Sequence, residues 1–197
     1  MVIRAEVDQA DIKRVQKKLK GIETKAPKVF RNAVNRTTTQ TMRKIRQGRS
    51  DYTVQTGTFN SAIDIHRASA AQMTAVIKAK DETHGLGESV YYKTSTSKKY
   101  GTRAKVLKAS GLKELVNSYG NKAFVAGVQT GHAGVTHVDV FQRTEEKGRL
   151  PIKKLQSVGV SKMVETIYKG KHGRESLKPF IKKTLHEELQ KELAKLT

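Results

Sequence analysis

The stretch Pro27–Gly48, PKVFRNAVNRTTTQTMRKIRQG, decides the fold prediction, because its apolar residues recur with the period of an α-helix. Proline suits the first turn of a helix, where its missing N–H is not needed. We therefore expect a helix from Pro27 to about Gly48. One face of this helix carries Phe30, Val34, Thr41 and Ile45.

The opposite face of the same helix is basic. At about 100° per residue its cations fall within an arc of about 140°, and few acidic residues interrupt them. Two interpretations stay open: a solvated surface, or a surface that meets phosphate or an acidic partner. The candidate DNA-facing or partner-facing residues are Lys28, Arg31, Arg36, Arg43, Arg46 and Arg49.

Strand patterns surround a polar centre, and further helices follow them. An edge strand is expected over 2–7, and Asp8 is expected to cap a helix whose apolar residues are Ile12, Val15, Leu19 and Ile22. Later elements are a short helix at 54–62, a hairpin of 63–66 with 74–79, strands at 103–108, 123–128 and 137–141, a helix opened by Ser161, and a last helix capped by Ser176.

The order of helices, strands and helices predicts an α+β fold, with an antiparallel β-sheet packed against N-terminal and C-terminal helices. We expect a single domain over 1–197, with a helical part at 1–50, a mainly sheet part at 51–143 and a helical part at 151–197. Residues 81–100 are rich in Gly, Ser and Thr and are expected to form a long, flexible polar loop.

Composition narrows the classes of function. The chain has 197 residues, with 39 Lys and Arg against 18 Asp and Glu, and a formal net charge of +21. This charge favours a polyanionic partner. The absence of Cys excludes disulfides and thiolate metal sites. No run approaches the ~18 apolar residues of a membrane span, and Met1–Glu6 lacks the apolar stretch of a signal peptide, so we expect no membrane partner and a cytosol-like compartment.

Motifs for catalysis are missing. No Gly-x-Ser-x-Gly elbow or phosphate-binding Gly-rich loop occurs, and the six His residues lack metal-ligand spacing. The best carboxylate cluster, Asp81, Glu82 and Glu88, falls in the expected loop. We therefore predict no enzyme, metal or cofactor. In the same loop Tyr91, Tyr92, Lys98 and Lys99 form a candidate contact patch, either a loop contact or a base-stacking surface.

Several segments, in the correct order, resemble the minor tail protein Z family of tailed bacteriophages and prophages. Ala33–Thr37 is similar to the family's Ala-Leu-Asn-Arg-Thr helix, and Ala123–Ala126 to its Ala-Phe-(Ile/Val)-Ala strand. Phe141–Arg143, Arg149–Ile152 and Val158–Met163 resemble the pattern Phe-x-Arg, Arg-x-Pro-Ile and Gly-Pro-Ser-Val-Pro-x-Met. The chain departs from this pattern because no Pro stands beside Val158 or Val160.

The resemblance implies a non-enzymatic structural protein of a virion, assembled in the bacterial host cytoplasm. It implies tail completion and head–tail joining at the neck, as a ring subunit around the DNA passage, with contacts to the tail terminator, tail tube, connector or tape-measure protein and non-specific contact with genomic DNA. Candidate subunit-interface residues are Arg143, Arg149, Tyr91, Tyr92, Lys98 and Lys99. The alternative is a sequence-nonspecific nucleic-acid-binding protein.

Overall fold

The structure is a computed structural model that describes residues 1–7, 12–13, 17, 25–69, 71–129 and 136–195. The described chain forms two compact units, called unit 1 and unit 2 here. Unit 1 comprises 1–48, 61–80 and 161–197, and unit 2 comprises 49–60 and 81–160. Most of the helix expected after Asp8 lies outside the described residues.

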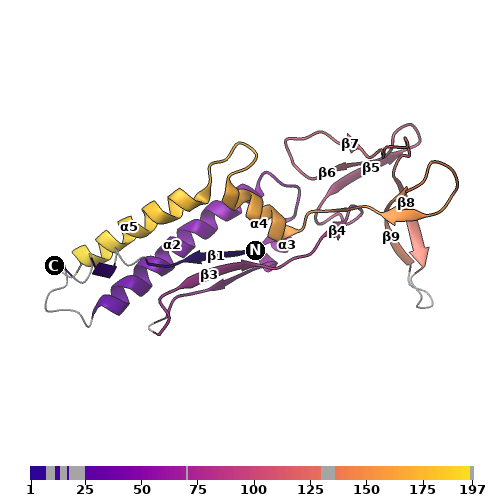
Figure 1. The fold of residues 1–197 in the computed structure, drawn as a ribbon. Helices are drawn as coiled ribbons and strands as arrows, with labels where there is room; N and C mark the ends of the chain where they lie inside the picture. Colours follow the sequence, from indigo (N-terminus) through magenta and orange to yellow (C-terminus); the bar gives the residue numbers. More distant parts are fainter. Residues whose placement is uncertain (8–11, 14–16, 18–24, 70, 130–135, 196–197) are drawn as a thin grey trace. The chain divides into compact units, whose positions relative to one another are not determined.

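Unit 1 combines a small sheet with long helices (Figure 1). Its elements are β1 (Val2–Ala5), α2 (Ala26–Arg49), β2 (Ile63–His66), β3 (Ala75–Ala79), α4 (Val160–Lys169) and α5 (Leu177–Ala194). The strands pair antiparallel in the order β1-β3-β2, with Ile77 opposite both Ile3 and Ile65. The expected edge strand, the hairpin and the long helix are therefore confirmed.

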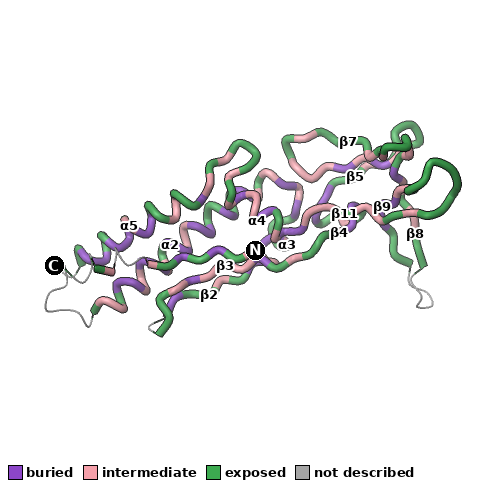
Figure 2. The backbone as a smooth tube through the Cα atoms, in the orientation of Figure 1, coloured by how far each residue is buried: buried purple, intermediate pink, exposed green. Residues whose placement is uncertain are grey.

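The core of unit 1 draws on the sheet and on both long helices. Buried side chains from β1, α2, β3 and α5 and the β2–β3 connection make one cluster, seen as purple segments in Figure 2: Ala5, Val29, Phe30, Ala33, Val34, Ala68, Ala75, Leu185, Leu189 and Leu193. Because α2 contributes the largest share, the stretch that led the sequence argument also organises the packing.

Three threonines of α2 lie in this interior without unsatisfied hydroxyl groups. Thr37, Thr38 and Thr41 are at most 1% exposed. Their hydroxyls donate to the carbonyls four residues earlier, at 2.8–2.9 Å. A hydroxyl buried without a partner would cost about 1–3 kcal/mol, so this back-bonding allows a polar sequence to form a buried helix face.

Unit 2 consists of short strands grouped into small antiparallel sheets. After α3 (Thr56–Ser61) come β4 (His84–Gly85), β5 (Lys93–Ser97), β6 (Gly101–Lys105), β7 (Lys113–Glu114), β8 (Phe124–Gln129), β9 (Thr136–Arg143), β10 (Ile152–Lys154) and β11 (Gln156–Ser157). The sheet orders are β5-β6-β7, β10-β9-β8 and β11-β4. The α+β class is confirmed, although the strands of the two units form four small sheets where the sequence suggested one.

The segment 81–100 contains strands β4 and β5, which differs from the expected loop. Residues 93–97 of β5 pair in register with 101–105 of β6. Their sequence, Lys-Thr-Ser-Thr-Ser, is polar on both faces, so no apolar alternation marks the strand. The hydroxyls of Thr96 and Thr102, opposite each other, lie 3.0 Å apart and join the two strands.

Candidate interaction groove and polar network

The basic residues of α2 do not form one uniform surface. Lys28, Arg36, Arg43 and Arg46 are exposed, whereas Arg31 and Arg49 are partly buried. Arg49 donates a hydrogen bond to the carbonyl of Val54 at 3.0 Å. Arg36 has partners in α5. The predicted face thus contains both structural arginines and cations that point to solvent.

A ladder of polar contacts joins α2 to α5 in unit 1. Arg36 lies 2.9 Å from Glu192 and 3.6 Å from Glu188. Asn32 Nδ2 donates to Glu192 at 2.8 Å, and Gln40 Nε2 donates to Glu188 at 3.1 Å. Each helix presents these residues at spacings of four, so one face of α2 meets one face of α5.

The two acids of this ladder are buried, with 4% of Glu188 and 6% of Glu192 exposed. The hydrogen bond from Lys191 is the main cause that lowers the pKa of Glu188 below its ordinary value. Burial alone would raise the pKa of Glu192, but hydrogen bonds from Lys195 and Asn32 outweigh it and lower this pKa as well. Both acids are therefore charged and paired at neutral pH.

A polar groove of about 410 Å³ opens beside this ladder within unit 1. Three guanidinium groups, three side-chain amides, one hydroxyl and one carboxylate line it: Arg36, Arg43, Arg67, Asn32, Asn35, Gln40, Thr39 and Glu188. Arg67 follows β2, and its Nη1 lies 3.3 Å from the hydroxyl of Thr39. Among the described residues, Arg43 has no hydrogen-bond or ion-pair partner.

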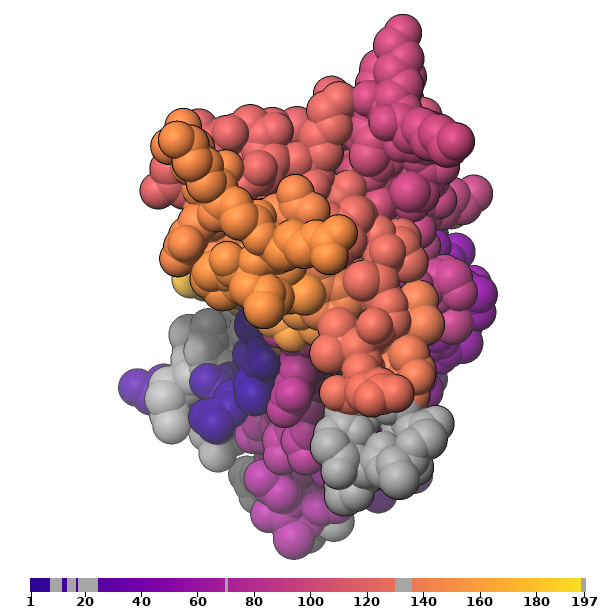
Figure 3. Space-filling model, turned by 90° about the vertical axis from the view of Figure 1, so that its right-hand side faces the viewer, coloured from indigo at the N-terminus to yellow at the C-terminus, as the bar shows by residue number. Residues whose placement is uncertain are grey.

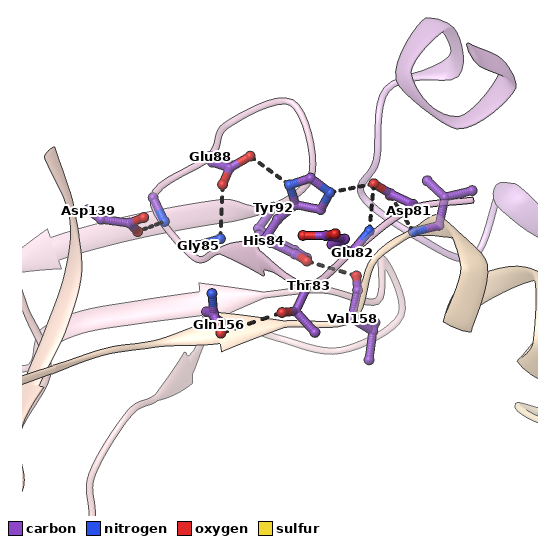
Figure 4. Close-up of polar contacts among 12 residues, drawn as sticks. Asp81, Glu82, Thr83, His84, Gly85, Glu88, Tyr92, Asp139, Gln156 and Val158 are labelled. Atoms are coloured by element: carbon purple, nitrogen blue, oxygen red, sulfur yellow. Dashed lines mark hydrogen bonds and ion pairs between the residues drawn. The ribbon is translucent and has the colours of Figure 1, made fainter. Parts of the chain in front are cut away.

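In unit 2 the segment 81–92 is organised by a polar network around His84 (Figure 4). His84 Nε2 is 2.7 Å from Asp81 Oδ1, and His84 Nδ1 is 2.9 Å from Glu88 Oε2. Carboxylates only accept hydrogen bonds, so both contacts are satisfied when both ring nitrogens carry a proton. The ring also stacks on Tyr91, with centroids 3.7 Å apart. This arrangement engages both ring nitrogens and fixes the position of the ring.

A second buried carboxylate, Asp139 of β9, connects β9 to the turn after β4. Its side chain is 1% exposed and lies 2.8 Å from Lys154 Nζ and 3.2 Å from His137 Nε2. The backbone N–H groups of Gly87 and Val140 each donate to Oδ1 at 2.7 Å. Burial alone would raise the pKa of Asp139, but the hydrogen bonds, above all from Lys154, hold it below its ordinary value.

Gly85 and Gly87 make room for this carboxylate. A Cβ at Gly85 would stand 1.8 Å from Asp139 Oδ2, and a Cβ at Gly87 would stand 2.8 Å from Oδ1. The Gly-Leu-Gly sequence thus serves the close approach of a side chain from β9 and not a phosphate.

The candidate interface residues separate into buried and exposed groups. Tyr91 is 8% exposed and Tyr92 is 1% exposed, and the Tyr92 hydroxyl donates to the carbonyl of Val158 at 2.8 Å. These tyrosines are core residues of unit 2, so the expectation of a surface contact patch is corrected for both. Burial raises the pKa of each phenol.

The remaining candidates lie at the surface of unit 2. Lys98 and Lys99 form the turn between β5 and β6, where Lys99 Nζ lies 5.1 Å from the centre of the Tyr100 ring. Arg143 ends β9 with its guanidinium 5.9 Å from the Phe124 ring, and Arg149 precedes β10. Within the part of the chain that the structure describes, no hydrogen bond or ion pair joins the lysine turn to either arginine.

Unit 2 also exposes apolar side chains in β8, in β9 and just before β10. Val125, Val138 and Leu150 are 46%, 61% and 73% exposed. Figure 3 shows the face on which the salmon and orange residues of the β8, β9 and β10 region lie at the surface. Exposed apolar side chains that gather in one region are typical of surfaces that contact other proteins.

Sequence reasoning missed most of the groove. Asn35 and Thr39 lie in α2 but follow no recognisable pattern in the sequence. Arg67 comes from a different part of the chain, so its position beside α2 could not be predicted. The signal that was available is the spacing of Asn32, Arg36 and Gln40 at intervals of four, matched by Glu188 and Glu192 in α5. Two facing polar stripes of this kind indicate a polar helix–helix contact.

The described residues also lack two features that would indicate other functions. They contain no group of three or more His, Asp or Glu side chains arranged to hold a metal ion. None of their helices combines the length and the apolar character that a membrane crossing requires. His132, one of the histidines considered in the sequence, lies outside the described residues.

Comparison with known protein families assigns nearly the whole chain. The family model described as prophage minor tail protein Z (GPZ) matches residues 10–197. No curated protein and no solved structure matches the chain significantly. Because the family model covers nearly the whole sequence, the chain belongs to the prophage minor tail protein Z family, whose members are structural proteins of phage tails.

Proposed function

We propose that this tail protein acts in tail completion and head–tail joining at the neck of the virion, as one subunit of a homo-oligomeric ring around the DNA passage. The observation that carries the proposal is the row of exposed cations along α2, Lys28, Arg43 and Arg46. Lys and Arg neutralise phosphates without reading sequence, and salt weakens the contact. Such a lining suits DNA that must pass without being held.

The partners that fit this role are the tail terminator, tail tube, connector and tape-measure proteins. Support comes from unit 2, whose surface exposes Arg143, Arg149, Lys98 and Lys99 and also several apolar side chains. Arginine offers a planar fork that suits carboxylates of a neighbouring protein. Catalysis is not needed for this role, and the engagement of both His84 nitrogens agrees with a structural function.

A phage carrying a null allele of this gene, complemented with variants, tests the proposal. The variant with Lys28, Arg43 and Arg46 changed to Glu is expected to leave heads and tails unjoined in electron micrographs and to lower the titre of infectious particles. The matched control reverses three exposed lysines of α5, Lys178, Lys182 and Lys183, with the same change in charge. Normal joining with the α2 variant would refute the role of this face.

A second candidate function is sequence-nonspecific nucleic-acid binding outside the virion, which the net charge of +21 favours. Its signature is tight DNA binding by the purified protein, with a steep fall in affinity as salt rises. The two candidates are separated by location. The first expects this chain in purified particles by mass spectrometry, whereas the second expects it to be absent from them.

A further inference from the structure

We infer that the groove between α2 and α5 binds an acidic polypeptide segment of another virion protein. The groove is shallow and open to solvent, with a volume of about 410 Å³. That volume is in the range of sites that hold a few side chains. Arg36 and Arg43 are seven residues apart on α2, so they face the same way about 10 Å apart along the helix axis.

The charges in the groove do not balance. Arg36, Arg43 and Arg67 contribute three cations, and Glu188 contributes the one carboxylate. That carboxylate already accepts hydrogen bonds from Lys191 at 2.8 Å and from Gln40 at 3.1 Å. Arg36 is engaged with Glu192 at 2.9 Å. Two guanidinium groups, those of Arg43 and Arg67, therefore keep most of their donors for a bound anion.

The remaining lining atoms favour a peptide over nucleic acid. Among the described residues, Gln40 Oε1 and Asn32 Oδ1 take part in no hydrogen bond, since both amides act through their nitrogens. These oxygens can accept from the N–H groups of a peptide backbone. A phosphodiester backbone offers only acceptors, so it has no donor for these two amide oxygens.

The charge of the chain argues that the segment comes from another protein. Residues 1–50 carry 14 basic and 4 acidic side chains, and 151–197 carry 11 and 5. The two middle stretches, 51–100 and 101–150, are also net basic. Since all four stretches are net basic, a second copy is a poor electrostatic match for a cationic groove. The virion origin of the partner rests on the proposed function, but the binding chemistry does not.

The test uses the full-length protein and two variants with equal loss of charge. Arg43→Gln with Arg67→Gln removes the free donors of the groove. Lys28→Gln with Arg46→Gln removes two exposed cations of α2 that do not line it. The groove variant should keep the melting temperature of the parent, because Arg43 has no partner among the described residues and Arg67 has only an exposed contact with Thr39. The control variant should keep it as well, because Lys28 and Arg46 are exposed.

The probes are a fluorescein-labelled ten-residue peptide of alternating Glu and Ser and a labelled 20-base-pair DNA duplex, measured by fluorescence anisotropy at fixed salt. We expect the groove variant to raise the peptide Kd by about tenfold or more, and the control to raise it less than about threefold. The inference is overturned by equal losses in both variants, by no peptide binding, or by a groove variant that weakens only the duplex. The assay needs no phage, so its failure is separate from failure of head–tail joining.

Discussion

Replacing Asp139 with Ala is expected to destabilise unit 2 by about 3–5 kcal/mol. The N–H group of Gly87 and the buried N–H group of Val140 would each lose an acceptor at 2.7 Å, and Lys154 would lose a carboxylate at 2.8 Å. Each hydrogen bond to a charged group contributes about 1.5–3 kcal/mol. The expected loss of stability is large because removing one carboxylate breaks all of these contacts at once. Asp139→Asn keeps an acceptor for both amides and should cost less, about 1–2 kcal/mol.

The same carboxylate explains Gly85, which makes the prediction sharper. Gly85→Ala places a Cβ 1.8 Å from Asp139 Oδ2, so it should also destabilise the parent, by about 1–3 kcal/mol. In the Asp139→Ala background that atom is gone. The two changes should therefore be less than additive, with a coupling energy of at least about 1 kcal/mol.

Guanidinium unfolding followed by circular dichroism gives the free energies of unfolding, and hydrogen exchange at the Val140 amide reports on unit 2 directly. Asp64→Ala, which removes an exposed acid from β2, is the control and should change stability by less than about 0.5 kcal/mol. If the effects of Gly85→Ala and Asp139→Ala simply add, Gly85 does not serve this carboxylate and the reasoning is refuted.

Three further predictions concern unit 1. The lowered pKa values of Glu188 and Glu192 mean that the unfolded chain binds more protons than the folded chain at acidic pH. The contribution of these two acids to the free energy of unfolding is therefore complete above about pH 5 and is lost as pH falls below about 4. Thermal melts across pH 3–6 measure this loss, and the Glu188→Gln, Glu192→Gln variant should show a flatter dependence of melting temperature on pH. Gly48→Ala sets a Cβ 2.6 Å from Ile167 Cγ2 and should lower the free energy of unfolding, measured in urea, by about 1–2 kcal/mol. A variant more stable than the parent would contradict this, because α2 and α4 would then have moved apart without cost. Ser176→Ala removes the side-chain acceptor for Lys178 N and should lower stability by about 1 kcal/mol, unlike Ser176→Asp, which should retain it.

Local pattern anticipated the regular elements well. α2 and β3 carry apolar residues at the helical and strand periods, and Ser176 caps α5 as its sequence indicates. The same reasoning failed for β5, because a strand of Lys, Thr and Ser has no apolar face to reveal it. Ser161 was expected to cap α4, yet α4 begins at Val160, whose N–H donates to Asp81 at 2.7 Å.

The candidate site shows where pattern reasoning stops. The basic residues of α2 were visible because helical geometry places residues of one helix on a common face. The basic pattern of α2 alone does not distinguish Arg36, which pairs with α5, from Arg43, which does not. That difference depends on Glu188 and Glu192, about 150 residues away along the chain. Tyr91 and Tyr92 were predicted to lie at the surface because the sequence around them is polar. In the folded chain both side chains are buried.

The sequence by itself determined the α+β class, the long basic helix, the strong positive charge and the resemblance to the tail protein family. These follow from periodicity, composition and short motifs, which act locally along the chain. Only the tertiary structure decided which cations are free, that Glu188 and Glu192 are buried, and that Gly85 and Gly87 admit Asp139. Such properties depend on contacts between distant residues, since burial and pairing are set by the neighbours that folding brings together.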